Sequence, residues 1–257
     1  MGNAPGTVTP PAGLDFALSQ DSWLRVTWRG RELFRYVYRP DEPLSESPRP
    51  YLHPLRTLGG CVVSVDRPHD HALARGLSLA PGEGGQRHAR FEVLNAGDRT
   101  LRCVQRLRWL APDGREVATE RRGLVVTVLP HRAAWRLDVD TALDRAVELD
   151  GGLFWRGPRG FEGGTVRTPA AKGGDDLDGV RAPWIAFSGR HDGDGSLSTV
   201  LITDDPDHPA EWFVRSERYA ALGARRAVAP RLRYSVVVAD GELDAAQCAQ
   251  LAGECGA

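Results

Sequence analysis

Hydrophobic and polar residues alternate with a period of two along several segments of the chain, a pattern typical of β-strands that bury one face. The clearest segment covers residues 101–109. Its hydrophobic positions are Leu101, Cys103, Leu107 and Trp109, and arginines stand between them. The segments 135–139 and 232–238 repeat the pattern. They predict long antiparallel strands with one face in a core and the other in water.

Turn residues separate these strands. The pair Arg29-Gly30 divides two alternating runs and predicts a β-hairpin over residues 24–38. Pro112-Asp113-Gly114 predicts a second reversal, after which residues 117–129 return as a strand. Shorter strands are predicted at 61–65, 77–80, 90–95, 184–188 and 197–203.

One helix is predicted, from Leu243 to about Leu251, with Asp240 as its N-cap. Many strands and one helix indicate an all-β protein, a large antiparallel β-sandwich with one short C-terminal helix. Residues 1–13 are rich in Pro, Gly and Ala and are expected to form a disordered tail. Residues 14–257 are expected to form one sandwich domain.

Net charge and cysteine content argue against several classes of protein. The formal net charge of -1 argues against nucleic acid as a partner. The four cysteines stand far apart and form no CxxC pair, so neither a zinc knuckle nor a disulfide framework is predicted. No leader and no long apolar run is visible, so we expect a soluble cytoplasmic protein with no membrane partner. The sequence indicates no oligomeric state.

Familiar catalytic motifs are absent. The sequence contains no P-loop, GxSxG, HExxH, GxGxxG or EF-hand pattern, so nucleotide, serine-hydrolase, zincin, dinucleotide and calcium sites are not predicted.

Candidate chemistry gathers between residues 49 and 76, in RPYLHPLRTLGGCVVSVDRPHDHALARG. Ring, guanidinium and carboxylate groups lie on both sides of the apolar run 61–65, so a fold that joins the two ends would collect them in one place. These groups are Tyr51, His53, Arg56, His69, Asp70 and His71. A second segment, GGLFWRGPRGFEGG at 151–164, is rich in glycine and aromatic residues and predicts a loop or bulged strand where backbone or ligand approaches closely.

Several blocks resemble the bacterial PmoA-like family. They are RPYLHPLRT (49–57), RPHDH (67–71), GGLFWRGPR (151–159), RAPWIAFSGRHDG (181–193), HPAEWFVR (208–215) and LRYSVVVADG (232–241). The resemblance implies a galactose-mutarotase-like supersandwich and a carbohydrate context. It does not imply methane oxidation, because that activity belongs to a membrane protein and this chain has no spanning segment. The chain is a divergent member: it has Ala74 and Arg75 where the family pattern implies histidines.

The carbohydrate context gives the candidate residues roles. Proton transfer at a sugar needs an acid and a base, and the candidates are His53, Asp70, His71 and Glu162. The alternative for Asp70 is that it caps a turn. The predicted substrate-binding residues could stack on a sugar or bind a carboxylate, although an aromatic residue in a β-protein is more commonly core; they are Tyr51, Arg56, Trp155, Arg156 and Arg159.

A metal site is a further alternative. His69 and His71 share a side of an extended segment, and with His53 they could hold a divalent metal. No cofactor is predicted, because the replacements at Ala74 and Arg75 reduce the possible ligands. The ranking is therefore a carbohydrate or sugar-acid enzyme (an isomerase, lyase or hydrolase), then a sugar-binding relative with a degenerate site, then a metal-dependent enzyme.

Overall fold

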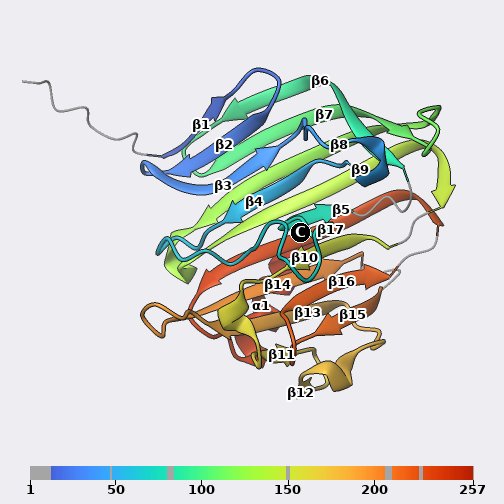
Figure 1. Cartoon of the computed structure of the whole chain (residues 1–257). Helices are drawn as coiled ribbons and strands as arrows, with labels where there is room; N and C mark the ends of the chain where they lie inside the picture. The colour runs from blue at the N-terminus through green and yellow to red at the C-terminus, as the bar shows by residue number, and fades with distance from the viewer. Residues whose placement is uncertain are drawn as a thin grey trace, which may run out of the picture.

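A computed structural model shows two antiparallel sheets packed face to face, with one helix near the C-terminus (Figure 1). It describes residues 13–46, 48–79, 84–148, 151–205, 210–225 and 228–256. The predicted disordered tail lies outside these residues except for Gly13, and so does His208. The predicted fold class, a large antiparallel β-sandwich with one short C-terminal helix, is confirmed.

The first sheet contains eight strands in an order that is not the order of the sequence. From edge to edge these are β1 (Leu14–Leu18), β2 (Trp23–Trp28), β3 (Arg31–Val37), β4 (Tyr51–Leu55), β5 (Leu77–Leu79), β10 (Leu153–Arg156), β16 (Ala221–Arg225) and β15 (Glu211–Arg215).

The second sheet contains nine strands and includes the longest ones. Its order is β12 (Lys172–Gly173), β11 (Thr165–Arg167), β13 (Trp184–Arg190), β14 (Leu197–Asp204), β17 (Val228–Asp240), β9 (Ala134–Glu148), β8 (Glu116–Leu129), β7 (Thr100–Leu110) and β6 (Gly85–Ala96). Short 3-10 turns connect several strands: η1 (Leu44–Glu46), η2 (Pro130–Arg132), η3 (Arg159–Phe161), η4 (Asp175–Leu177) and η5 (Glu254–Gly256).

The main core lies between the sheets and uses the predicted strand faces. In β7 the side chains of Leu101, Cys103, Leu107 and Trp109 are buried, as the alternation predicts. In β17 the even positions from Leu232 to Val238 face this core. The predicted hairpin forms with β2 and β3 around Arg29 and Gly30, whose φ angles of 50° and 79° give the positive values that a two-residue hairpin turn needs.

A smaller cluster covers the outer face of the nine-stranded sheet. Alternate residues of β13, β14 and β17, including Trp184, Leu201 and Val237, pack there against helix α1 (Ala245–Gly253) through Cys248 and Leu251. These strands are buried on both faces, which explains their continuous hydrophobic runs.

Three local predictions need correction. The cap of α1 is Asp244, whose carboxylate accepts from the Gln247 amide, whereas Asp240 accepts from the Gly59 amide. Residues 61–65 form no strand and make only one isolated bridge, from Val62 to Arg56. The glycine-rich segment contains a regular strand, β10, inside the eight-stranded sheet.

Candidate functional site

The two predicted segments meet because β5, which directly follows the first one, pairs with β10 in the second (Figure 1). Leu79 lies opposite Leu153, and Leu77 lies opposite Trp155. The loop between β4 and β5 is also tied to β10, since the Val65 amide donates to the Arg156 carbonyl at 3.0 Å. The structure therefore brings part of the predicted set together on the outer face of the eight-stranded sheet.

An ion pair joins the loop to the sheet. The Arg156 guanidinium donates from Nη2 to Asp70 at 2.7 Å and from Nη1 to the Ala220 carbonyl at 3.2 Å. Its central carbon lies 4.1 Å from the ring centroid of Tyr219, a cation–π distance. Burial alone would raise the pKa of the Asp70 carboxyl, but Arg156 outweighs it and holds that pKa below its usual value. Asp70 is thus an ionised anchor.

A second buried arginine supports the other side of the loop. Arg75 pairs with Asp66 at 3.3 Å and with Glu42, and it lies 5.2 Å from the Tyr51 ring centroid. Burial, followed by the charge of Asp66, raises the pKa of Tyr51 to about 12, so its phenol stays protonated. Arg75 therefore joins the two ends of residues 66–75, and Arg156 holds the middle of this loop at Asp70.

The turn 68–71, which contains Asp70, carries two histidines that are exposed to solvent. His69 and His71 are exposed, and the His71 amide donates to the Pro68 carbonyl at 3.0 Å, which closes the turn. In this arrangement the two histidines flank the ionised Asp70.

His53 lies on β4 and has a structural contact. Its Nδ1 is 2.9 Å from the Ser64 hydroxyl, whose oxygen also accepts from the Leu55 amide at 2.9 Å. Burial lowers the pKa of His53, so its imidazole is neutral near pH 7.

Two predicted binding residues contribute to the scaffold. Trp155 is fully buried, its indole donates to the Val63 carbonyl at 2.8 Å, and its ring packs near Phe161 and Phe187. A Cβ at Gly157 would lie 2.6 Å from the Trp155 ring, so this glycine makes room for the indole. The Arg56 carbonyl accepts from the Trp135 indole at 2.7 Å, and its guanidinium donates to the Gly60 carbonyl at 3.3 Å.

Arg159 and Glu162 belong to a different neighbourhood. Both are exposed at η3, where a Cβ on the intervening Gly160 would lie within 3 Å of Arg190 and Asp192. Among the described residues, no hydrogen bond or ion pair joins Glu162 to His53, Asp70 or His71, so their joint role stays a prediction.

The predicted metal ligands do not converge. Within the described ranges, no group of three or more His, Cys, Asp or Glu side chains has an arrangement that could hold a metal ion, and His53, His69 and His71 all lie in those ranges. These side chains do not fit a divalent metal as they stand.

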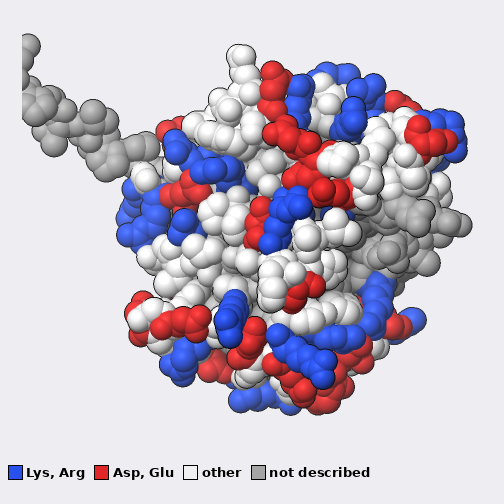
Figure 2. Space-filling model, in the orientation of Figure 1, with Lys and Arg blue, Asp and Glu red and all other residues white. Residues whose placement is uncertain are grey.

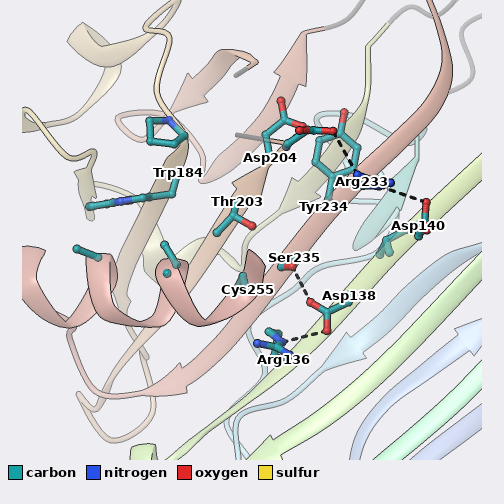
Figure 3. A pocket seen from close by; sticks show the side chains of 16 residues that line it. Arg136, Asp138, Asp140, Trp184, Thr203, Asp204, Arg233, Tyr234, Ser235 and Cys255 are labelled. Carbon is teal, nitrogen blue, oxygen red and sulfur yellow. Dashed lines mark hydrogen bonds and ion pairs between the residues drawn. The ribbon is translucent and has the colours of Figure 1, made fainter. Parts of the chain in front are cut away.

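A cavity elsewhere contains none of the predicted site residues. This space of about 580 Å³ lies between α1 and the outer face of the nine-stranded sheet. Figure 3 shows the side chains that line it. Asp138 accepts from Ser235 at 2.6 Å and from Arg136 at 3.0 Å, and Arg233 lies 3.9 Å from both Asp140 and Asp205 (Figure 3). Because these charges are already paired with one another, this cavity offers little to a charged ligand.

Charges of both signs are intermixed on the face that carries the Asp70 loop (Figure 2). No helix in the described part of the chain is long and apolar enough to span a membrane.

Sequence reasoning missed the roles of Tyr219 and Arg75. In the sequence, Arg75 stands out only as a replacement for a histidine. Its neighbours Ala74 and Gly76 carry no charge, so nothing nearby indicates that Arg75 forms ion pairs. Tyr219 lies 63 positions from Arg156, and no spacing rule relates the two residues.

Comparisons with known proteins give a family and a distant structural likeness. The chain is similar to the heparan sulfate lyase HepC mutant from Pedobacter heparinus, at 12% identity and a TM-score of 0.47, over 95% of this chain and 38% of that protein. The chain thus spans well under half the length of that protein. No curated protein matches it. The family described as "Family of unknown function (DUF6807)" matches residues 24–253. Since this match covers nearly all of the 257 residues, the chain belongs to the DUF6807 family.

Proposed function

We propose that the chain binds a carbohydrate or sugar acid on the outer face of the eight-stranded sheet, at the surface formed by the turn 68–71 and Tyr219. The observation that supports this proposal is the Asp70–Arg156 ion pair with Tyr219 against the guanidinium. This ion pair holds the turn 68–71, with its exposed histidines, beside the ring of Tyr219.

This combination suits a polyhydroxylated ligand. Imidazole nitrogens can donate to or accept from sugar hydroxyls, and a half-buried tyrosine offers both a ring and a hydroxyl. The arginines below keep the turn ordered before binding, which reduces the entropy lost when a ligand binds. The PmoA-like resemblance supplies the carbohydrate context for the proposal.

A second candidate function is proton transfer on the same ligand, as in an isomerase, lyase or hydrolase. The observation that favours it is that His69 and His71 flank an ionised carboxylate. In this mechanism Asp70 orients the turn, because its lowered pKa leaves it ionised, with no proton to donate near neutral pH, and an imidazole transfers the proton.

Binding is tested by recording amide chemical shifts while neutral sugars and sugar acids are added. We expect shifts at residues 68–76 and 216–220, and at least a tenfold loss of affinity in Tyr219→Ala, because the ring contact is removed. His131→Ala is the matched control, since His131 is exposed on η2 in the other sheet. Shifts confined to residues 190–195 would contradict this placement.

Turnover separates the two candidates. Anomer exchange, elimination and hydrolysis are followed with the wild type, His71→Ala and His69→Ala. A binding protein shows no turnover of a bound sugar, whereas the enzyme loses turnover in one histidine variant while its affinity for the sugar stays within about twofold.

A further inference from the structure

Five arginines form a patch on the outer face of the nine-stranded sheet, across β6, β7 and β8. In one row Arg90 lies opposite Arg106, which in turn lies opposite Arg121. In the next row Arg87 lies opposite Arg108. Neighbouring strands are about 5 Å apart and the two rows about 7 Å apart, so the five positions share an area of roughly 10 by 7 Å. We call these five residues the arginine patch.

The alternation along β7 shows on which face the patch lies. Leu107 and Trp109 are buried between the sheets, so the arginines on either side of Leu107 point outward. The register of β6 shifts between His88 and Arg90, and this shift keeps both arginines of β6 opposite the outward arginines of β7. Helix α1 packs on β13, β14 and β17 and leaves the patch uncovered.

Three arginines of the patch share one carboxylate. Glu92 accepts from Arg106 at 2.6 Å and from Arg121 at 2.9 Å, and it lies 3.6 Å from Arg90. The hydrogen bonds from the first two arginines hold the pKa of Glu92 below its usual value, so its carboxylate is ionised near pH 7. One negative charge therefore faces three positive ones in this row.

The other row has no ion pair of its own. Within the described ranges, neither Arg87 nor Arg108 pairs with a carboxylate. Two carboxylates border the same stretch of surface: Glu42 is bound by Arg75, and Asp41 is exposed. Like charges at directly opposed positions destabilise a sheet, so the patch holds an excess of positive charge at a cost in stability.

The neighbouring strand β9 does not supply the missing charge. Asp140 is bound by Arg231 at 2.6 and 2.9 Å, and Asp144 accepts from the Thr119 amide at 3.0 Å. These carboxylates are therefore bound to other groups. A ligand with several anionic groups would balance the patch, whereas a single carboxylate spans too little of it.

The residues around the patch favour one class of polyanion. No aromatic side chain stands at the outward-facing positions of β6, β7 and β8, all of which the structure describes. Protein partners are held mainly by buried aromatic and aliphatic anchors, and single-stranded nucleic acid stacks its bases on aromatic rings. A chain of acidic sugars needs neither, because repeated carboxylates can each pair with a guanidinium.

We propose that the arginine patch binds an acidic polysaccharide, a chain whose successive sugars carry carboxylates, through the guanidinium groups of both rows. The patch lies on the opposite sheet from the turn 68–71 and Tyr219, and the proposal stands whether or not that surface binds a sugar.

The test is a titration of the full chain with an oligogalacturonate, galacturonate, a neutral maltodextrin of the same length and a DNA duplex, followed by calorimetry and amide chemical shifts. We expect the oligogalacturonate to shift residues 87–92, 106–108 and 119–121 and to bind at least tenfold more tightly than galacturonate, because several ion pairs form at once. Its affinity should fall at least tenfold between about 50 and about 300 mM NaCl.

Two variants probe the patch in different ways. Arg87→Gln/Arg108→Gln should lower the affinity at least tenfold while the thermal midpoint stays the same or rises, because a repulsion is removed. Thr119→Glu keeps every arginine but places a carboxylate opposite Arg108, and it should weaken binding by a similar factor.

Arg181→Gln/Arg190→Gln is the charge-matched control, because these exposed arginines lie beside β15 and on β13, away from the patch. It should leave the affinity within twofold, and so should Tyr219→Ala. The proposal is overturned if the oligogalacturonate binds no more tightly than galacturonate or the maltodextrin, if it shifts only residues near Tyr219, or if the Arg87/Arg108 and Thr119 variants bind like the wild type. Binding of the DNA duplex at the patch as tightly as the oligogalacturonate would also overturn it.

Discussion

Asp70 is the residue through which the loop between β4 and β5 is held against the sheet, and this role differs from the acid–base role predicted for it. Its carboxylate is 39% exposed, whereas its partner Arg156 is 7% exposed, so the arginine depends on the pair more than the aspartate does. The predicted alternative, in which Asp70 caps a turn, stays a prediction, because the turn is closed by the His71 amide and the Pro68 carbonyl while the Asp70 carboxylate pairs with Arg156.

Replacing Asp70 with Asn should destabilise the fold on the order of 1–2 kcal/mol at pH 7, because a buried guanidinium loses its counter-charge. The pKa of Asp70 is lower in the folded state than its usual value, so the stabilisation is present above the unfolded pKa of about 3.9 and is lost as the pH falls through the folded value. Urea unfolding at pH 7 and at a pH below the folded pKa of Asp70 measures this difference. Glu217→Gln, which changes an exposed carboxylate nearby, is the control. An equal effect of Asp70→Asn at both pH values would show that the charge is not involved.

Among the secondary-structure elements, helix α1 has its start defined by hydrogen bonds in its first turn. Asp244 accepts from the Gln247 amide at 2.8 Å, and the Gln247 side chain accepts from the Asp244 amide at 2.9 Å, which is a capping box. The helix then covers Trp184 and Leu201 on the outer face of the sheet.

Asp244→Ala should therefore lower the free energy of unfolding by about 1 kcal/mol, because the Gln247 amide loses its acceptor and the capping box is broken. The measurement is the thermal or urea midpoint, together with near-UV circular dichroism to detect any change around Trp184. Asp244→Asn retains an acceptor and should stay close to the wild type. A loss in the Asn variant as large as in the Ala variant would mean that the charge, rather than the cap, stabilises the helix.

At the scale of the molecule, the space between the sheets contains a buried ion pair as well as a hydrophobic core. Glu120 is fully buried and accepts from Arg122 at 2.7 Å and from the Trp109 indole at 2.7 Å. Arg122 in turn donates to Gln86, so the network joins β6, β7 and β8.

Glu120→Gln should destabilise the protein by about 3–5 kcal/mol, because it leaves the Arg122 charge buried without a counter-charge. Glu92→Gln is the comparison: Glu92 has arginine partners at 2.6 and 2.9 Å but lies at the surface, and its loss should change the unfolding midpoint far less. Equal midpoints for the two variants would contradict the importance of burial.

Local sequence patterns were sufficient to predict the fold class and most strands. Period-two alternation is a local property, and a strand that buries one face and exposes the other shows it, as in residues 101–109. The Arg29-Gly30 turn and the C-terminal helix were also visible, because turn and helix preferences act over a few neighbouring residues. The candidate site groups could be recognised only as two separate segments of the sequence, 49–76 and 151–164.

Only the tertiary structure decided which of those groups meet. Strand β5 lies beside β10 although more than 70 residues separate them, and this pairing depends on how whole sheets pack rather than on any local pattern. It places Asp70 on Arg156 and Tyr219, and it puts Trp155 in the core instead of at a ligand surface. Glycine near Trp155 signalled a close approach correctly, but the group that approaches is the protein's own indole, because a strand in the middle of a sandwich must fill the space between the sheets.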